Sequence, residues 1–392
     1  MPSIRVLVVD DSVVIRKVLC ESLVSDPEIE IAGSAPDGSI ALSKIRQLKP
    51  DVVTLDVEMP VMSGIETLTE IRKLYPTLPV IMFSTLTERG AATTLDALAL
   101  GASDYLTKPQ GAGSVEETRR RIQQELIPKL KGLCHRTWFN TTTPVAPSVG
   151  NVEKPPTPRV NIQSGRIDLV AIGTSTGGPN ALAVVLPAIP KDFPVPIVIV
   201  QHMPPLFTRL LAERLQKQSA IKIREGQAGA VLKAGEAWIA PGDFHMVVNR
   251  EEREVKLALN QEPPENSCRP AVDVLFRSVA RTYGANALGV VLTGMGSDGV
   301  LGTKTMKAAG AQIVVQDEAT SVVWGMPGQV TAAGVADGVY PLEEIAAELQ
   351  RRTSKSLWFQ DKKGSGRQES TEADKVRQGD STNSFFAGRE RQ

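Results

Sequence analysis

The chain has 392 residues, which is enough for two domains with substantial cores. Its 44 basic and 44 acidic residues balance, so the overall charge gives no indication of general nucleic-acid binding. Three widely separated cysteines, Cys20, Cys134 and Cys268, indicate neither a disulfide framework nor a metal knuckle, and a reducing cytoplasm fits them. The N-terminus has no signal-peptide pattern and no stretch is apolar for long enough to cross a bilayer, so we expect a cytoplasmic protein without direct membrane insertion.

Residues 1–130 show a short apolar run followed by a helical pattern five times over. Apolar runs of this length that alternate with helices are typical of parallel strands in a doubly wound α/β domain. The expected fold is flavodoxin-like, with a five-stranded parallel sheet. The strands are predicted near residues 4–9, 29–33, 52–55, 80–83 and 104–106.

Polar residues follow the expected strands of this first block. Asp10 and Asp11 follow the first strand, Asp56 the third, Ser84 the fourth and Lys108 the fifth. Because parallel strands all point the same way, these residues should meet at the carboxyl edge of the sheet. Any single aspartate at a strand end could simply cap the next helix. Three carboxylates together favour a Mg²⁺ site, and the lysine beside them could hold a transferred phosphoryl group.

A set of short motifs in the first block carries a family resemblance. The motifs are Asp10-Asp11, Leu55-Asp-Val-Glu-Met-Pro60, Ser63-Gly64, Ser84-Thr85, Gly101-Ala-Ser-Asp-Tyr105 and Lys108-Pro109. With them, residues 3–125 strongly resemble a response-regulator receiver domain. The resemblance implies that Asp56 accepts phosphate from a histidine kinase and that Asp10 and Asp11, with Asp56, hold the Mg²⁺ needed for phosphorylation.

The same resemblance implies roles for further residues at this edge. Ser84 and Lys108 would contact the phosphoryl group, and Tyr105 would be the aromatic residue that moves on activation. The Lys108–Pro109 peptide bond would be cis, a state that proline makes accessible. The first block is therefore expected to be a phosphorylation-controlled module.

The rest of the chain divides into a linker, a second block and a tail. Residues 131–166 are rich in Pro, Thr, Ser and Asn, which predicts a flexible linker. Residues 167–350 resume the alternation, which predicts a second doubly wound, mostly parallel α/β domain. Residues 351–392 are polar with mixed charge, and we expect a disordered tail. The Phe385-Phe386 pair in this tail could be a docking motif, although a stray aromatic pair is the simpler interpretation.

Three apolar runs of the second block each stop at a polar residue, namely Ser175, His202 and Asp298. If the runs are parallel strands, these residues meet at one carboxyl edge, and a serine, a histidine and an aspartate there suggest a hydrolase. Ser175 fits a G-x-S-x-G elbow, in which the backbone amide of Thr176 would point at a developing oxyanion. A helix N-terminus of this kind could instead hold a phosphate, but no G-x-G-x-x-G or Walker sequence is present here.

Histidine is scarce, since the chain has only His135, His202 and His245. His135 falls in the expected linker, where a fixed catalytic geometry is hard to maintain. His245 falls in a predicted hairpin of residues 244–248 and 255–259, where we expect a surface or supporting role. A lone histidine is more often structural, but His202 ends a strand that should face the elbow serine, so we predict that it is the general base.

Asp298 could orient the imidazole, or it could simply cap the helix that follows. We favour the orienting role because Asp192 and Asp243 lie in turns less obviously near the same edge. Cys268 is a rival nucleophile because it precedes a helix, but it has no elbow and no histidine follows it, so we interpret it as a small neutral residue. The order Ser, His, Asp also differs from that of the common α/β-hydrolase fold.

Motifs of the second block carry a second resemblance. They are Ile172-Gly-Thr-Ser-Thr-Gly-Gly-Pro179, Gln201-His-Met-Pro204, Arg269-Pro-Ala-Val-Asp-Val-Leu-Phe276, Leu292-Thr-Gly-Met-Gly-Ser-Asp-Gly299 and Val323-Trp-Gly-Met-Pro327. Residues 167–350 with these motifs resemble the catalytic domain of the chemotaxis protein-glutamate methylesterases, the CheB family. The resemblance implies that Ser175 is the nucleophile, His202 the base and Asp298 the orienting residue, with Thr176 and Met295 near the oxyanion.

This family resemblance also implies a substrate. It would be the γ-carboxyl methyl ester of glutamate on cytoplasmic chemoreceptor helices, with methanol released, and deamidation of receptor glutamines would be a second activity. Hydrolysis itself would need no cofactor.

We expect the receiver to cover the hydrolase edge in one conformation and to free it when Asp56 is phosphorylated. Residues 160–392 alone should therefore hydrolyse the ester faster than the unphosphorylated chain.

Two other classes of protein remain as alternatives. A receiver is often joined to a DNA-binding domain, but the second block is too large and too rich in strands for a helix-turn-helix and lacks a basic helix. An adaptor that binds chemoreceptors without chemistry would keep the fold but would not need the Ser, His, Asp set. A methanol-release assay separates the adaptor from the enzyme.

Overall fold

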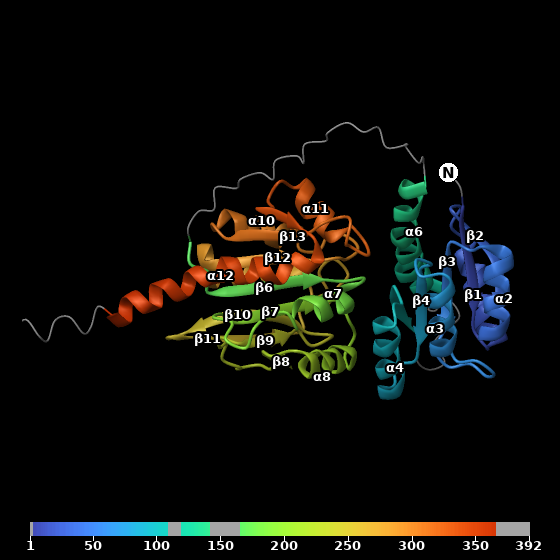
Figure 1. Cartoon of the computed structure of the whole chain (residues 1–392), viewed down its shortest axis with the longest axis horizontal. Coiled ribbons are helices and arrows are strands. Elements are labelled where there is room, and N and C mark those ends of the chain that lie inside the picture. Colours follow the sequence, from blue (N-terminus) through green and yellow to red (C-terminus); the bar gives the residue numbers. More distant parts are fainter. Residues whose placement is uncertain (1–2, 109–118, 142–164, 366–392) are drawn as a thin grey trace, which may run out of the picture.

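The computed structural model describes residues 3–108, 119–141 and 165–365, and it contains two α/β bodies (Figure 1). The first holds a five-stranded parallel sheet in the order β2-β1-β3-β4-β5, which confirms the predicted flavodoxin-like fold. Every predicted strand is present. The strands are β1 (Ile4–Val9), β2 (Ile29–Ala35), β3 (Val52–Asp56), β4 (Val80–Ser84) and β5 (Asp104–Thr107).

Helices of the first body begin where short polar residues cap them. Each of the first four helices has a Ser, Thr or Asp side chain that accepts from an amide of its first turn, which satisfies a donor that the helix itself cannot. At Ser63 the cap is reciprocal, because Glu66 also accepts from the Ser63 amide. The helices are α1 (Val13–Leu23), α2 (Gly38–Leu48), α3 (Gly64–Leu74), α4 (Glu88–Ala99) and α6 (Ile127–Thr141), with a π-helical segment at Ile122–Leu126 before α6.

Helix α6 extends into the segment that we expected to be a linker. It continues to Thr141, so position 135 is helical. Leu130 and Leu133 of α6 pack in a buried cluster with strand residues such as Val6, which explains why the helix continues past residue 130. The proline-rich residues 142–164 and the Lys108–Pro109 bond lie outside the described residues, whereas Arg269–Pro270 is a cis bond within them.

The second body holds a seven-stranded parallel sheet in the order β14-β13-β12-β6-β7-β9-β8. This confirms the predicted doubly wound fold, and its central strands are fully buried. The strands are β6 (Leu169–Thr174), β7 (Ile197–Gln201), β8 (Lys222–Glu225), β9 (Glu236–Ile239), β12 (Ala287–Val291), β13 (Gln312–Gln316) and β14 (Gly338–Tyr340). The predicted hairpin is also present, as antiparallel β10 (His245–Glu251) and β11 (Glu254–Asn260).

Helices cover both faces of this sheet (Figure 1). They are α7 (Gly178–Val185), α8 (Phe207–Gln218), α9 (Val272–Tyr283), α10 (Val300–Ala308), α11 (Met326–Ala332) and α12 (Leu342–Ser365), with a 3₁₀ turn at Gly284–Asn286. Helix α12 runs past Arg351 to Ser365, so the first part of the expected disordered tail is helical. The Phe385-Phe386 pair lies outside the described residues. Among the described helices, none has the length and apolar character needed to span a membrane.

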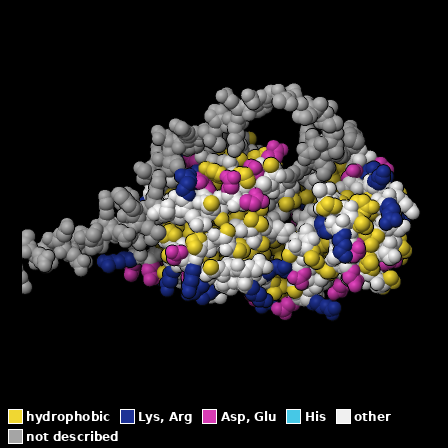
Figure 2. All heavy atoms as spheres, viewed as in Figure 1, with side chains coloured by type: hydrophobic (Ala, Val, Ile, Leu, Met, Phe, Trp, Pro, Cys, Tyr) yellow, Lys and Arg dark blue, Asp and Glu magenta, His cyan; other side chains and the backbone are white. Residues whose placement is uncertain are grey.

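The two bodies pack against each other along the carboxyl edge of the second sheet. Helix α4 contacts α7 and α8, and the ring of Tyr105 stacks on that of Phe207 with centroids 4.8 Å apart. Two charged pairs, Arg209 with Glu88 and Arg214 with Asp96, cross the same boundary. On the face shown in Figure 2, basic and acidic side chains are interspersed over both bodies, in keeping with the balanced composition.

Candidate active site

The catalytic candidates of the second body follow three adjacent strands. Strand β6 pairs with β7 on one side and β12 on the other, and the chain order reverses between β6 and β12. The Ser175 amide donates to the Thr293 carbonyl at 3.1 Å, and the His202 amide donates to the Thr174 carbonyl at 3.2 Å. These bonds hold the three strand ends together, so Ser175, His202 and the loop that carries Asp298 emerge at one edge, where doubly wound sheets place their sites.

Ser175 lies on a tight turn between β6 and α7. Gly177 has a φ of 79°, a conformation that favours glycine, and α7 begins at the next residue. A Cβ on Gly178 would lie 1.9 Å from Oε1 of Gln201, so the turn leaves no space for a side chain there. The Ser175 side chain is half-buried, and among the described residues no hydrogen bond joins its hydroxyl to His202. The turn therefore has the form of an elbow, with its serine not yet engaged.

His202 and Asp298 form a direct hydrogen bond. Nε2 of His202 lies 2.7 Å from Oδ2 of Asp298. The Asp298 carboxylate also accepts from the backbone amides of Val272 at 2.6 Å, Asp273 at 3.0 Å and Gly299 at 3.0 Å. Two of these amides belong to the first turn of α9, so the helix N-terminus holds the carboxylate. Asp298 thus binds the N-terminus of α9, which lies after a different strand, rather than serving only as the cap of α10.

The contacts of this pair set its protonation. Burial raises the pKa of Asp298, but the hydrogen bond and charge of His202 and the backbone amides outweigh burial, so the net shift is downward. Burial lowers the pKa of His202, but the sulfur of Cys268 and the Asp298 carboxylate outweigh it and raise this pKa to about 10. An ionised carboxylate beside a protonated imidazole follows near neutral pH, so His202 can act as a base only after it has lost a proton.

Cys268 contacts the candidate base, which the sequence interpretation missed. Its Sγ lies 3.6 Å from Nδ1 of His202. No histidine follows Cys268 in the chain, but His202 precedes it and lies beside it in space. The location of Cys268 in the sequence could have indicated this contact, because it lies just before α9, whose first amides bind Asp298.

Three other candidates within the described residues, His245, Asp243 and Asp192, do not join the pair. His245 is buried rather than at the surface, and its ring accepts from the Ala271 amide and lies 3.2 Å from the Pro263 carbonyl, so it supports the loop that leads to α9. Asp243 pairs with Arg269, and Asp192 is exposed in a turn. These contacts agree with the supporting role expected for His245.

Both oxyanion candidates contact the receiver. The Thr176 hydroxyl donates to Oδ2 of Asp104 at 2.7 Å, and Asp104 is itself paired with Lys129 of α6 at 2.7 Å. Met295 packs against the apolar cluster that α6 contributes to the receiver core. No signal in the sequence pointed to Asp104, because the contact joins residues that are far apart in the chain.

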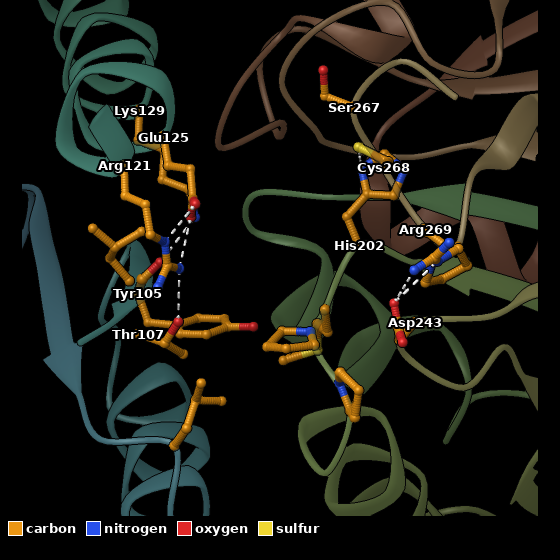
Figure 3. A pocket seen from close by; sticks show the side chains of 16 residues that line it. Tyr105, Thr107, Arg121, Glu125, Lys129, His202, Asp243, Ser267, Cys268 and Arg269 are labelled. Carbon is orange, nitrogen blue, oxygen red and sulfur yellow. Dashed lines mark hydrogen bonds and ion pairs between the residues drawn. The ribbon is translucent and has the colours of Figure 1, made fainter. Parts of the chain in front are cut away.

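A cavity of about 440 Å³ lies between the two bodies beside His202. Figure 3 shows Tyr105, Arg121 and Lys129 on the receiver side of it, facing His202 and Cys268. Since residues of both bodies line the cavity, a substrate can reach His202 through it only past the receiver.

The receiver edge carries the predicted acidic cluster. Carboxylate oxygens of Asp10, Asp11 and Asp56 lie within 4.8 Å of one another. Nζ of Lys108 lies 2.7 Å from Oδ2 of Asp56 and 3.0 Å from Oδ2 of Asp10. Burial raises the pKa of Asp56 to about 6, against the opposing charge of Lys108 and with a further upward push from Asp10. Clustered oxygen donors with excess negative charge are the set that Mg²⁺ prefers.

Ser84 ends β4 at this edge, but its hydroxyl is used elsewhere. It lies within hydrogen-bond distance of the carbonyls of Gly90, at 3.0 Å, and Thr85, at 3.2 Å. Within the described part of the chain it makes no hydrogen bond to Asp56. A contact between Ser84 and a phosphoryl group therefore stays a prediction, and it requires the hydroxyl to turn away from Gly90.

Comparisons with known proteins agree with both halves of this arrangement. Residues 6–119 match the response regulator receiver domain and residues 170–349 match the CheB methylesterase. The chain is 52% identical to the protein-glutamate methylesterase/protein-glutamine glutaminase of Trichodesmium erythraeum, over 90% of this chain and 99% of that protein. It is 48% identical to the protein of the same name from a Nocardioides species, over 91% and 97%.

A solved structure is also similar. The catalytic domain of the Thermotoga maritima CheB methylesterase is 42% identical and covers 47% of this chain and 98% of that domain, with a TM-score of 0.47. The full-length relatives span receiver and hydrolase together, in the same order as here. The chain therefore belongs to the family of response-regulator protein-glutamate methylesterases/protein-glutamine glutaminases.

Proposed function

We propose that this protein hydrolyses glutamate methyl esters on the cytoplasmic helices of chemoreceptors, releasing methanol, and deamidates receptor glutamines in chemotactic adaptation. The observation that carries the proposal is the His202–Asp298 hydrogen bond of 2.7 Å at the strand edge that also carries Ser175. The names of its relatives, methylesterase and glutaminase, give the substrate class. The protein would act in the cytoplasm, where these receptor segments lie.

In the proposed reaction, Ser175 attacks the ester carbonyl and His202 takes its proton. Nε2 of His202 is bonded to Asp298, so Nδ1 is the nitrogen that must act as the base. The Thr176 amide and the Met295 segment are the candidates for stabilising the oxyanion. Methanol leaves as His202 returns the proton, and water then attacks the acyl-enzyme to release glutamate. Ammonia would leave in place of methanol during deamidation.

The receiver would be phosphorylated on Asp56 by a histidine kinase. The three carboxylates of Asp10, Asp11 and Asp56 fit Mg²⁺ as a donor set, and the ion would neutralise charge on the incoming phosphoryl group. Lys108 would contact the phosphoryl group, since its ammonium already lies 2.7 Å from Asp56. Ser84 would be the second contact after its hydroxyl is released from Gly90.

Phosphorylation would act by uncovering the hydrolase edge. The unphosphorylated receiver holds Thr176 through Asp104 and stacks Tyr105 on Phe207, so a movement of Tyr105 would loosen both contacts.

We assign residues 1–130 to the receiver and 167–350 to the catalytic domain, with 131–166 as the linker and 351–392 as the tail. The family matches at 6–119 and 170–349 support the two domains, while α6 and α12 run beyond these bounds.

The test is methanol release from methylated receptor membranes, with and without a small phosphodonor. Ser175→Ala should reduce release by at least about a thousandfold. Ser297→Ala is the matched control, since this serine lies on the same edge but is exposed, and it should retain activity. Full turnover by Ser175→Ala would show that Ser175 is not the nucleophile. If the unchanged protein bound the receptor membranes but released no methanol, the adaptor function would be favoured.

A further inference from the structure

The imidazole of His202 has a partner on each ring nitrogen. Nε2 is bonded to Asp298 at 2.7 Å, and Nδ1 faces the Cys268 sulfur at 3.6 Å. A cysteine sulfur can accept a hydrogen bond, if weakly, and its longer reach makes 3.6 Å a bonded distance. The nitrogen that must take the Ser175 proton is therefore already occupied by a residue with no part in the proposed reaction.

Cys268 is held at this position by a tight turn. The Glu265 amide donates to the Cys268 carbonyl at 3.1 Å, and the Cys268 amide donates back to the Glu265 carbonyl at 2.9 Å. Arg277 of α9 binds both carboxylate oxygens of Glu265, at 2.6 and 2.5 Å. Asn266 and Ser267, between the two ends, have φ values of 53° and 62°, which are uncommon for residues with a side chain. The location of the sulfur is thus fixed by backbone and ion-pair contacts on both sides.

The same turn also holds the acid. Nδ2 of Asn266 donates to Oδ1 of Asp298 at 2.9 Å and to Oδ2 of Asp273 at 3.0 Å. One short segment therefore contacts both members of the pair, with Asn266 on the carboxylate and Cys268 on the imidazole. A segment that only filled space would not need to contact both the Asp298 carboxylate and the His202 imidazole.

We propose that Cys268 is a positioning residue for the catalytic base: its sulfur accepts from Nδ1–H of His202 in the receiver-covered chain and is displaced by the Ser175 hydroxyl before proton transfer. This inference rests on the proposed function. While the sulfur holds Nδ1–H, the ring has a proton on each nitrogen and cannot act as a base. The ring becomes competent as a base when this proton passes to solvent water in the adjoining cavity and the Ser175 hydroxyl replaces the sulfur at Nδ1.

Other charged groups near His202 would stay unchanged when Cys268 is replaced. On the carboxylate side of the ring, Asp273, Glu265 and Arg277 interact electrostatically with Asp298, and His245 interacts with Glu265. The groups that line the cavity on the other side are Asp243, Arg269, Tyr105, Arg121, Glu125 and Lys129. Because the Cys268 sulfur raises the pKa of His202, its removal should lower that pKa against this constant background.

The first test is an NMR titration of the full-length chain. The sequence has three histidines, so His202→Gln identifies the resonances of His202 directly. In Cys268→Ala the pKa of His202 should fall by about one unit or more, a tenfold change in the neutral fraction at a given pH. Cys20→Ala, a cysteine of α1 in the receiver, is the control and should not change it. An unchanged or higher pKa in Cys268→Ala overturns the proposal, whatever the enzyme activity.

The second test is the pH profile of kcat/KM for p-nitrophenyl acetate, measured on the unphosphorylated full chain. The acid limb of Cys268→Ala should move to lower pH, with about a tenfold gain one unit below the wild-type midpoint. Cys268→Ser, which keeps an acceptor at this position, should return the limb toward wild type. If Cys268→Ala lost activity while the acid limb of its kcat/KM profile stayed at the wild-type pH, Cys268 would have only a structural role. Equal rates for Ser175→Ala and wild type would instead refute the proposed function, and the NMR titration would still decide on Cys268.

Discussion

The two sheets place carboxylates at the same topological position, but the surroundings shift the pKa values of these carboxylates in opposite directions. In the receiver the strand order reverses between β1 and β3, and Asp10 and Asp56 stand at the ends of those strands. In the second body it reverses between β6 and β12, and Asp298 follows β12. Asp298 accepts from three backbone amides and from His202, and its pKa is lowered. Asp56 is buried next to Asp10, and its pKa is raised to about 6.

This difference shows that the position in the fold supplies a carboxylate but the neighbouring donors decide its chemistry. Asp298 has its negative charge satisfied by fixed dipoles, so it suits the orientation of an imidazole. Among the described residues, one ion-pair partner, Lys108, serves both Asp56 and Asp10, so a cation and then a phosphoryl group can complete the site.

The largest effect is expected at the satisfied carboxylate. Asp298→Asn removes the charge that orients and stabilises the His202 imidazolium, and turnover should fall by about 10⁴-fold, as when the acid of other Ser-His-Asp sites is neutralised. Ester hydrolysis by the phosphorylated chain measures it. Asp192→Asn, at an exposed turn, should retain full activity. Phosphorylation of Asp56 should be unchanged in both variants, and a loss of phosphorylation in Asp298→Asn would contradict the separation of the two sites.

Removal of divalent cations should affect the receiver edge alone. The carboxylates of Asp10, Asp11 and Asp56 repel one another without a cation, so chelation of Mg²⁺ should reduce phosphoryl incorporation from acetyl phosphate roughly tenfold or more. Basal hydrolysis of p-nitrophenyl acetate should not change in the same buffer. Restoring Mg²⁺ is the control. If chelation slowed the basal hydrolysis as well, the contrast between the two edges would be wrong.

The sequence predicted the parts of both edges that depend on strand order. Strands β1, β3 and β4 of the receiver and the polar residues at their ends could be read from apolar runs, because a buried parallel strand leaves a continuous apolar pattern. Contacts made by loops could not be read in this way. The turn that brings Cys268 to His202 depends on backbone conformations at Asn266 and Ser267 that no apolar pattern encodes. The bond between Thr176 and Asp104 depends on how two domains pack.

The His202–Asp298 pair should make the stability of the second body depend on pH. A depressed pKa of Asp298 contributes stability that is present above about pH 4 and is lost as the pH falls through the folded value. A raised pKa of His202 contributes stability that is complete below about pH 6.5 and declines as the pH rises toward about 10. The pair therefore contributes most to stability between about pH 4 and about pH 6.5.

Urea unfolding of wild type and Asp298→Asn at several pH values measures this window. The variant should be less stable by about 1–3 kcal/mol at pH 5 to 6, the usual penalty for a buried hydrogen-bonded group left unpaired. The difference should shrink at pH 3 and again near pH 10. A difference that stayed constant across this range would show that the His202–Asp298 pair does not titrate with unfolding.

The smallest effect is expected where the two bodies meet through exposed charges. Arg214 lies 2.6 Å from Asp96, and both side chains are partly exposed, so the pair contributes at most about 1 kcal/mol to the covered state. Arg214→Glu would place like charges together and should raise the ester hydrolysis of the unphosphorylated chain about two- to fivefold, because the free hydrolase edge becomes more populated. The double variant Arg214→Asp with Asp96→Arg should return the rate to that of wild type, while Lys73→Glu, in an exposed pair within the receiver, should leave it unchanged. If the unphosphorylated rate does not respond to Arg214→Glu, then the contacts of Thr176 and Tyr105 alone hold the receiver over the hydrolase edge, and the surface charges only flank them.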